Sequence, residues 1–194
     1  RRVQKLGTSA GHHRFIWDLK YAPPRGAEAS YSIAAVYNNT PSGPLGPMVN
    51  PGRYRVRLTV DGEVTEKPLA LRMDPRVSIS SAALKSQHNL SMACYQAYHE
   101  LQEMAETMVT QRKPSLAALA LLGTGSPSDQ DILYGSIRAV SPEKATIIGL
   151  QNKLIYMMNV LQSADVNPTS QAQNGVKDLL DVAVILKVRR NKED

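Results

Sequence analysis

The residues from Pro51 to Met73 carry the clearest pattern in the sequence, PGRYRVRLTVDGEVTEKPLALRM. Apolar and polar residues alternate up to Asp61-Gly62, which is the period of a strand with one buried face. Asp-Gly is a preferred pair for a two-residue type I′ turn, because both central residues take positive φ. The segment therefore predicts a β-hairpin whose strands meet at Asp61 and Gly62.

A two-residue turn also predicts which hairpin residues lie opposite each other. It places Tyr54 opposite Leu69 on the face expected to be buried, and Arg57 opposite Glu66 on the outer face. A cross-strand pair of opposite charges contributes about a few tenths of a kcal/mol. Pro68 cannot donate a ladder hydrogen bond, so the second strand is expected to be an edge strand or to bulge there.

A second alternating stretch, HRFIWDLKY from His13 to Tyr21, predicts a further strand of the same β domain. Phe15, Trp17 and Leu19 would lie on its apolar face. Trp17 is the only tryptophan of the chain, and we expect it to anchor the core of the sheet. Stacking of an exposed Trp17 against a sugar is the alternative interpretation.

The net charge of +6 is confined to the first part of the chain. Residues 1–76 hold 12 of the 23 Lys and Arg and 6 of the 17 Asp and Glu, whereas residues 77–194 hold equal numbers of both. Arg53, Arg55 and Arg57 form a stripe on one face of the first hairpin strand. This stripe is either a surface for an acidic partner or a solvated face that keeps the sheet soluble, and both interpretations remain open.

Asp74-Pro75-Arg76 separates the two parts of the chain. A residue that precedes proline favours extended geometry, which ends a strand. We therefore expect two domains, a β domain over residues 1–76 and an α-helical bundle over residues 77–194.

The second part contains three segments in which apolar residues recur every three or four positions, as in amphipathic helices. The first is expected to begin at Ser80 or Ser81, the second at Ser141 and the third at Asn167-Pro168-Thr169. Their apolar stripes consist of Leu90, Ala93, Ala97, Leu101, Met104 and Met108, then Ile147, Leu150, Leu154, Met157 and Leu161, then Ala172, Val176, Leu179, Ala183 and Leu186. Three such helices with short or polar links predict an antiparallel three-helix bundle.

The sequence contains no recognisable catalytic arrangement. Cys94 is the only cysteine, which excludes an internal disulfide and a cysteine-rich zinc site, and we expect it to be a small buried hydrophobe. His12 and His13 lack partners at metal-ligand spacing. We therefore expect no enzyme activity, no cofactor and no metal. The modest charge argues against nucleic-acid binding, and no apolar run is long enough for a transmembrane segment.

Several motifs follow one another along the chain: Gly11…Arg14-Phe15…Trp17-Asp18-Leu19, Gly43-Pro44, Pro51-Gly52-x-Tyr54-x-Val56-x-Leu58-x-Val60-Asp61-Gly62, Pro68-Leu69…Asp74-Pro75-Arg76-Val77, and Leu161-Gln162-Ser163-Ala164-Asp165…Pro168-Thr169. In this order they resemble the C-terminal region of large bacterial proteins with BNR-type, sortilin-like β-propellers, which are commonly labelled glycosyl hydrolases. The resemblance covers most of the chain except residues 111–139. It implies that the β part is an incomplete antiparallel β-sandwich of the immunoglobulin or fibronectin III type, with its first strands before residue 1.

The same resemblance implies a function. The propeller, in which any glycosidase activity of that family would reside, is absent from this sequence, so no catalytic residue can be carried over. We expect a non-catalytic structural or protein-interaction module, periplasmic or secreted. It would be the tail of a propeller protein or a subunit docked on a larger assembly, such as a membrane-protein complex. The alternative is a carbohydrate-recognition accessory of a secreted glycosyl hydrolase.

Overall fold

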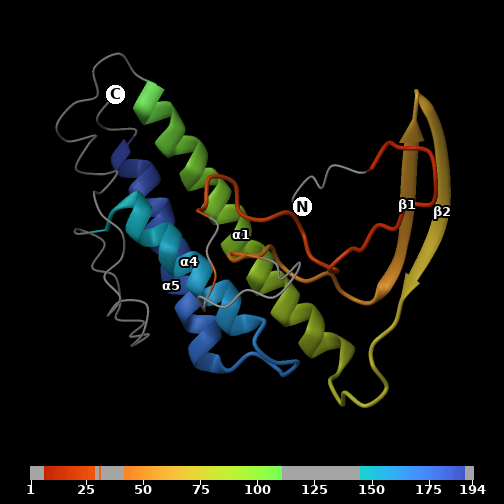
Figure 1. Cartoon of the computed structure of the whole chain (residues 1–194). Coiled ribbons are helices and arrows are strands. Elements are labelled where there is room, and N and C mark those ends of the chain that lie inside the picture. Colours follow the sequence, from red (N-terminus) through yellow and green to blue (C-terminus); the bar gives the residue numbers. More distant parts are fainter. Residues whose placement is uncertain (1–6, 29–30, 32–41, 111–144, 191–194) are drawn as a thin grey trace.

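The computed structural model describes residues 7–28, 31, 42–110 and 145–190. The elements of these residues are, in chain order, β1 (Gly52–Val60), β2 (Glu63–Leu71), α1 (Ser81–Thr110), α4 (Ile147–Leu161) and α5 (Ser170–Arg190). The helices lie side by side, and the β1–β2 hairpin stands apart from them on the side of α1 (Figure 1).

The hairpin has the predicted register. β1 and β2 pair antiparallel, with Tyr54 opposite Leu69 and Arg57 opposite Glu66. Asp61 and Gly62 have φ values of 49° and 87°, the positive values that a type I′ turn requires. The strands pair one to one through Pro68, so β2 has no bulge there, and among the described residues it pairs only with β1, which makes it an edge strand.

The predicted β-sandwich is wrong. β1 and β2 form one two-stranded sheet, and the described residues contain no second sheet for it to pack against. The stretch from His13 to Tyr21 is not a strand: its backbone makes one isolated bridge, from Lys20 to Met48, and turns at Leu19, where φ is 59°. Alternation of apolar residues predicts which face a strand would bury, but a sheet also requires neighbouring strands, and this stretch does not pair along its length.

The three helices agree with the predicted bundle. α4 runs opposite to α1 and α5, as Figure 1 shows, and it packs against both. The hydrophobic core of the described residues lies between these helices, and it consists of Cys94, Ala97, Tyr98, Leu101, Met108, Ala145, Ile147, Leu150, Leu154, Met157, Met158, Leu161, Val176, Leu179, Val182, Ala183 and Leu186. Most residues of the predicted apolar stripes are among them.

Side-chain caps set the starts of the helices. The hydroxyl of Ser80 accepts from the amide of Ala83 at 3.1 Å, and that of Thr169 accepts from the amide of Ala172 at 3.2 Å, so α1 and α5 begin as predicted. α4 begins after Thr146, whose hydroxyl accepts from the Gly149 amide at 3.2 Å. The start predicted at Ser141 lies outside the described residues.

The loops that precede the hairpin dock on the helices. The Tyr21 amide donates to the Pro47 carbonyl at 2.8 Å, which holds the two loops together. Gly46 is buried at their crossing, where a Cβ would lie 2.3 Å from the carbonyl oxygen of Ala22, so only glycine fits there. The guanidinium of Arg25 lies 3.3 Å from the carboxylate of Glu106 on α1. These contacts place the hairpin relative to the helices.

Candidate functional site

The two faces of the hairpin differ in chemistry. Cross-strand partners point to the same side of a sheet, so the register defines both faces. The apolar face carries Tyr54, Val56, Leu58 and Val60 of β1 opposite Leu69, Lys67, Thr65 and Glu63 of β2. The arginine face carries Arg53, Arg55, Arg57 and Thr59 opposite Ala70, Pro68, Glu66 and Val64.

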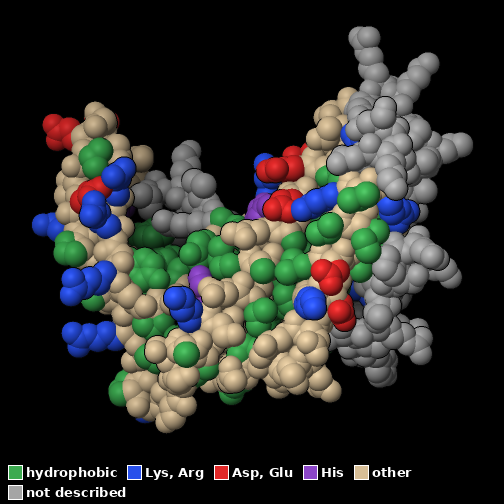
Figure 2. Space-filling model, turned by 180° about the vertical axis from the view of Figure 1, so that it is seen from behind, with side chains coloured by type: hydrophobic (Ala, Val, Ile, Leu, Met, Phe, Trp, Pro, Cys, Tyr) green, Lys and Arg blue, Asp and Glu red, His purple; other side chains and the backbone are tan. Residues whose placement is uncertain are grey.

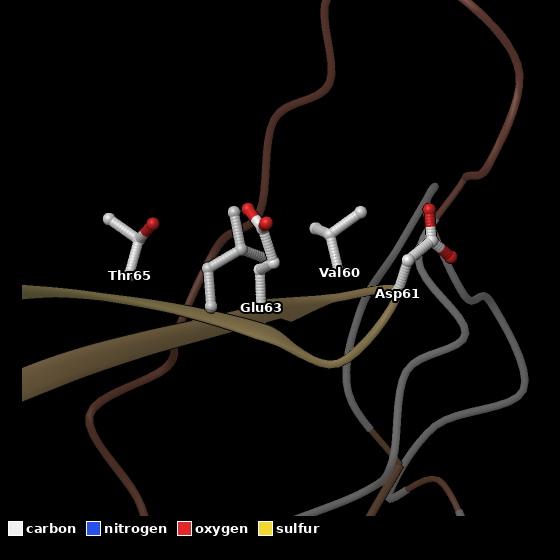
Figure 3. Close-up of a pocket in the computed structure, with 5 residues that line it drawn as sticks. Val60, Asp61, Glu63 and Thr65 are labelled. Atoms are coloured by element: carbon white, nitrogen blue, oxygen red, sulfur yellow. The ribbon is translucent and has the colours of Figure 1, made fainter.

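The apolar face, which was expected to be the buried one, is largely open. Val56, Leu58 and Val60 are 51%, 50% and 55% exposed, because the predicted second sheet is missing from the described residues. An open depression of about 350 Å³ lies beside the turn on this face. Figure 3 shows the labelled side chains that line it rising from one side of the hairpin, namely Val60, Asp61, Glu63 and Thr65.

Trp17 covers only the far end of the apolar face. Its ring meets Tyr54 edge to face, with ring centroids 5.8 Å apart, and its indole N–H donates to the carbonyl of Lys20 at 3.1 Å. The Tyr54 hydroxyl donates to the Asn50 carbonyl at 2.5 Å. Tyr54 lies opposite Leu69, as predicted. Both aromatic side chains are only half-buried, so Tyr54 is not part of a closed core.

The arginine face holds one carboxylate between two guanidinium groups. Arg55 Nη1 lies 3.0 Å from Glu66 Oε2, and Arg57 Nε lies 2.6 Å from Glu66 Oε1. Arg53 makes no ion pair within the described part of the chain. The three arginines of the stripe are exposed, and Glu66 is the only acidic residue of this face of the hairpin, so the face keeps a net charge of +2. Figure 2 shows Lys and Arg side chains along the hairpin, which is separated from the helices by a hollow.

The histidines and the cysteine do not assemble a reactive centre. His12 and His13 are exposed, and His13 contacts the Ser9 carbonyl at 2.7 Å. Cys94 is fully buried between the helices, and burial raises the pKa of its thiol to about 12. In the described ranges, no group of three His, Cys, Asp or Glu side chains could hold a metal ion. None of the helices that the structure describes has the length and apolar character needed to cross a bilayer.

His99 has surroundings that the sequence analysis did not identify. Its ring contacts Tyr95 edge to face at a centroid distance of 4.4 Å, and Tyr98 at 5.7 Å. Nε2 of His99 is buried without a hydrogen-bond partner within the described residues. Burial lowers the pKa of the imidazole, the positive charge of Arg25 lowers it further, and Glu103 opposes the shift. Helical spacing puts Tyr95 beside His99, but the effect of Arg25 on the imidazole joins positions 74 residues apart, and no local pattern predicts it.

No family model, curated protein or solved structure matches this chain.

Proposed function

We propose that this chain is a non-catalytic structural or protein-interaction module that docks on a partner protein through its hairpin. The observation that carries this proposal is the open apolar face, on which Val56, Leu58 and Val60 are each about half exposed. A two-stranded hairpin is only marginally stable alone, so a partner that covers this face would also stabilise it. Contiguous apolar side chains at a surface are typical of protein interfaces.

The organisation of the helices supports the same proposal. Their core consists of residues of α1, α4 and α5 together with Ala145, and it includes no residue of β1 or β2. The apolar face is therefore not part of the packing that stabilises the helices. An apolar surface that the helical core does not use is available to another protein.

We further propose the setting that the motif resemblance suggests. The chain would be the tail of a propeller protein, or a separate subunit docked on a larger periplasmic or secreted assembly such as a membrane-protein complex. The partner would then be the propeller or another subunit of that assembly. The carbohydrate-recognition alternative lacks a specific supporting observation, because Trp17 packs on Tyr54 and its N–H donates to Lys20.

The test is an interface map of the native complex combined with one pair of variants. Leu58→Lys places a charge on the apolar face, whereas Val184→Lys places the same charge on α5 at a residue that is 57% exposed. We expect cross-links from the purified complex to fall on the hairpin, and Leu58→Lys to weaken association about tenfold or more while Val184→Lys leaves it unchanged. Cross-links confined to the helices, with both variants binding normally, would refute the proposal.

A further inference from the structure

The register determines which backbone groups of the hairpin remain without a ladder partner. A two-residue turn makes Val60 and Glu63 a hydrogen-bonded pair, and such pairs alternate with non-hydrogen-bonded pairs along an antiparallel ladder. Residues of the non-hydrogen-bonded pairs direct their N–H and C=O groups outward. On β1 these residues are Arg53, Arg55, Arg57 and Thr59, and on β2 they are Val64, Glu66, Pro68 and Ala70.

The two outer edges of the hairpin are therefore not equivalent. Pro68 occupies an outward position of β2 and has no N–H to donate, which interrupts that edge and also explains why the ladder tolerates a proline there. The outer edge of β1 has no such interruption, and its four outward residues are exposed. Within the described ranges, β2 is the only strand that pairs with β1. An open edge of this kind is a template for another strand.

We propose that the outer edge of β1 binds an extended segment of a partner protein in which acidic and apolar residues alternate. The added strand would extend the sheet, with main-chain hydrogen bonds to the outward groups of β1. This inference rests on the proposed interaction function, and it specifies the edge that is used and the chemistry of the partner segment.

The side chains of β1 select the chemistry of the segment. A strand added beside β1 places alternate side chains next to Arg53, Arg55 and Arg57, whose face carries only one carboxylate, Glu66. Acidic side chains at these positions form favourable cross-strand pairs. The intervening side chains of the added strand lie beside Val56, Leu58 and Val60, which are half exposed, and apolar residues there would cover them.

A second copy of β1 does not meet these requirements. If two β1 strands paired antiparallel with matching faces, the arginines of one copy would lie beside the arginines of the other, and like charges in such pairs are destabilising. If the pairing shifted by one residue, the apolar face of one strand would continue into the arginine face of the other. The charge of the stripe therefore favours a different, acidic partner segment.

The experiment uses the full chain and a short synthetic peptide of alternating glutamate and valine, with a lysine and valine peptide as the charge control. Amide hydrogen exchange measured by NMR reports each backbone N–H separately. Thr59→Pro and Val64→Pro form a matched pair, because the two residues lie opposite each other and each substitution removes one outward N–H without removing a ladder bond. Neither substitution changes a charge.

We expect the glutamate peptide to slow exchange at Arg53, Arg55, Arg57 and Thr59, and not at Val64, Glu66 or Ala70. Thr59→Pro should weaken binding about tenfold or more, whereas Val64→Pro should change it less than about twofold. If Thr59→Pro unfolds the hairpin, the exchange pattern of the unsubstituted chain decides the question alone. Absence of binding, equal binding of the lysine peptide, or protection of the β2 edge would overturn the inference.

The outcomes also separate this inference from the proposed function. If a native partner cross-links to the hairpin while the outward amides of β1 stay unprotected in the complex, docking uses the apolar face and only the edge inference fails. If the native complex has no cross-links at the hairpin, the proposed function fails with it.

Discussion

The backbone amide of Met48 donates to the side-chain oxygen of Gln162, 2.6 Å away and 114 positions along the chain. The Met48 carbonyl accepts from Nδ1 of His88 on α1 at 2.8 Å. Gln162 is the C-terminal cap of α4, and its side-chain amide donates to the Met158 carbonyl at 3.2 Å, which fixes the orientation of the side chain. A single backbone position before β1 is thus anchored to two helices.

We predict that Gln162→Leu loosens this anchor. The leucine offers no acceptor, so the Met48 amide loses its partner, and the free energy of unfolding should fall by about 1 kcal/mol in urea titrations. Amide exchange at Met48 should become faster. Gln162→Glu retains an acceptor oxygen and should leave that exchange rate nearly unchanged. Equal exchange rates in the leucine variant and the unsubstituted chain would contradict the role assigned to Gln162.

The Asp61-Gly62 turn provides a second prediction. Gly62 has a φ of 87°, a region that β-branched residues avoid, and a Cβ there would meet nothing within 4 Å. The cost of Gly62→Val is therefore backbone strain and not a clash, and we expect destabilisation of about 1 kcal/mol or more by chemical unfolding. Asp61→Asn is the matched control, because asparagine tolerates positive φ and should cost little. A valine variant as stable as the asparagine variant would contradict the assigned turn.

Local patterns predicted the parts of the fold that local chemistry determines. The two-residue turn alone sets the pairing of Arg57 with Glu66, and the hydroxyls of Ser80 and Thr169 set the starts of α1 and α5. The arginine stripe was likewise identified from alternation. The ion pair from Arg55 to Glu66, which lies diagonally across the strands, was not anticipated.

The predictions from sequence that the structure contradicts concern packing between distant parts of the chain. The alternation of Val56 and Leu58 correctly grouped them on one face, but it could not show whether another sheet covers that face. The resemblance to sandwich domains supplied that expectation, and the described structure contradicts it. The contact of Met48 with Gln162 joins distant positions through a backbone amide, and such a contact has no signature in either segment of sequence.

Cys94 should be unreactive in the folded protein. Burial raises the pKa of its thiol to about 12, so at pH 8 the reactive thiolate is on the order of 10⁻⁴ of the total, and the side chain is inaccessible. We expect a colorimetric disulfide reagent to modify the native thiol on the order of 10³-fold more slowly than the unfolded one. A thiol that reacts equally fast before and after unfolding would show that Cys94 is not held in the helical core.

His99 should make the stability of the chain depend on pH. The pKa of the folded imidazole lies below the ordinary value of 6.5, first because of burial and then because of Arg25, although Glu103 opposes the shift. The unfolded chain therefore takes up a proton near pH 6.5 that the folded chain resists. The contribution of the neutral His99 ring to the free energy of unfolding is fully present above pH 6.5 and is lost as the pH falls below that value. The free energy of unfolding should therefore decrease between about pH 7 and pH 5.

The measurement is urea unfolding across that range for three chains. His99→Gln removes the titrating group, so its free energy of unfolding should change less with pH than that of the unsubstituted chain. Asn159→Ala changes an exposed side chain of α4 that does not titrate and should keep the original pH dependence. The comparison stays above about pH 5, because Asp and Glu side chains begin to protonate below it. An unchanged slope in His99→Gln would mean that the buried Nε2 does not resist protonation in the folded chain.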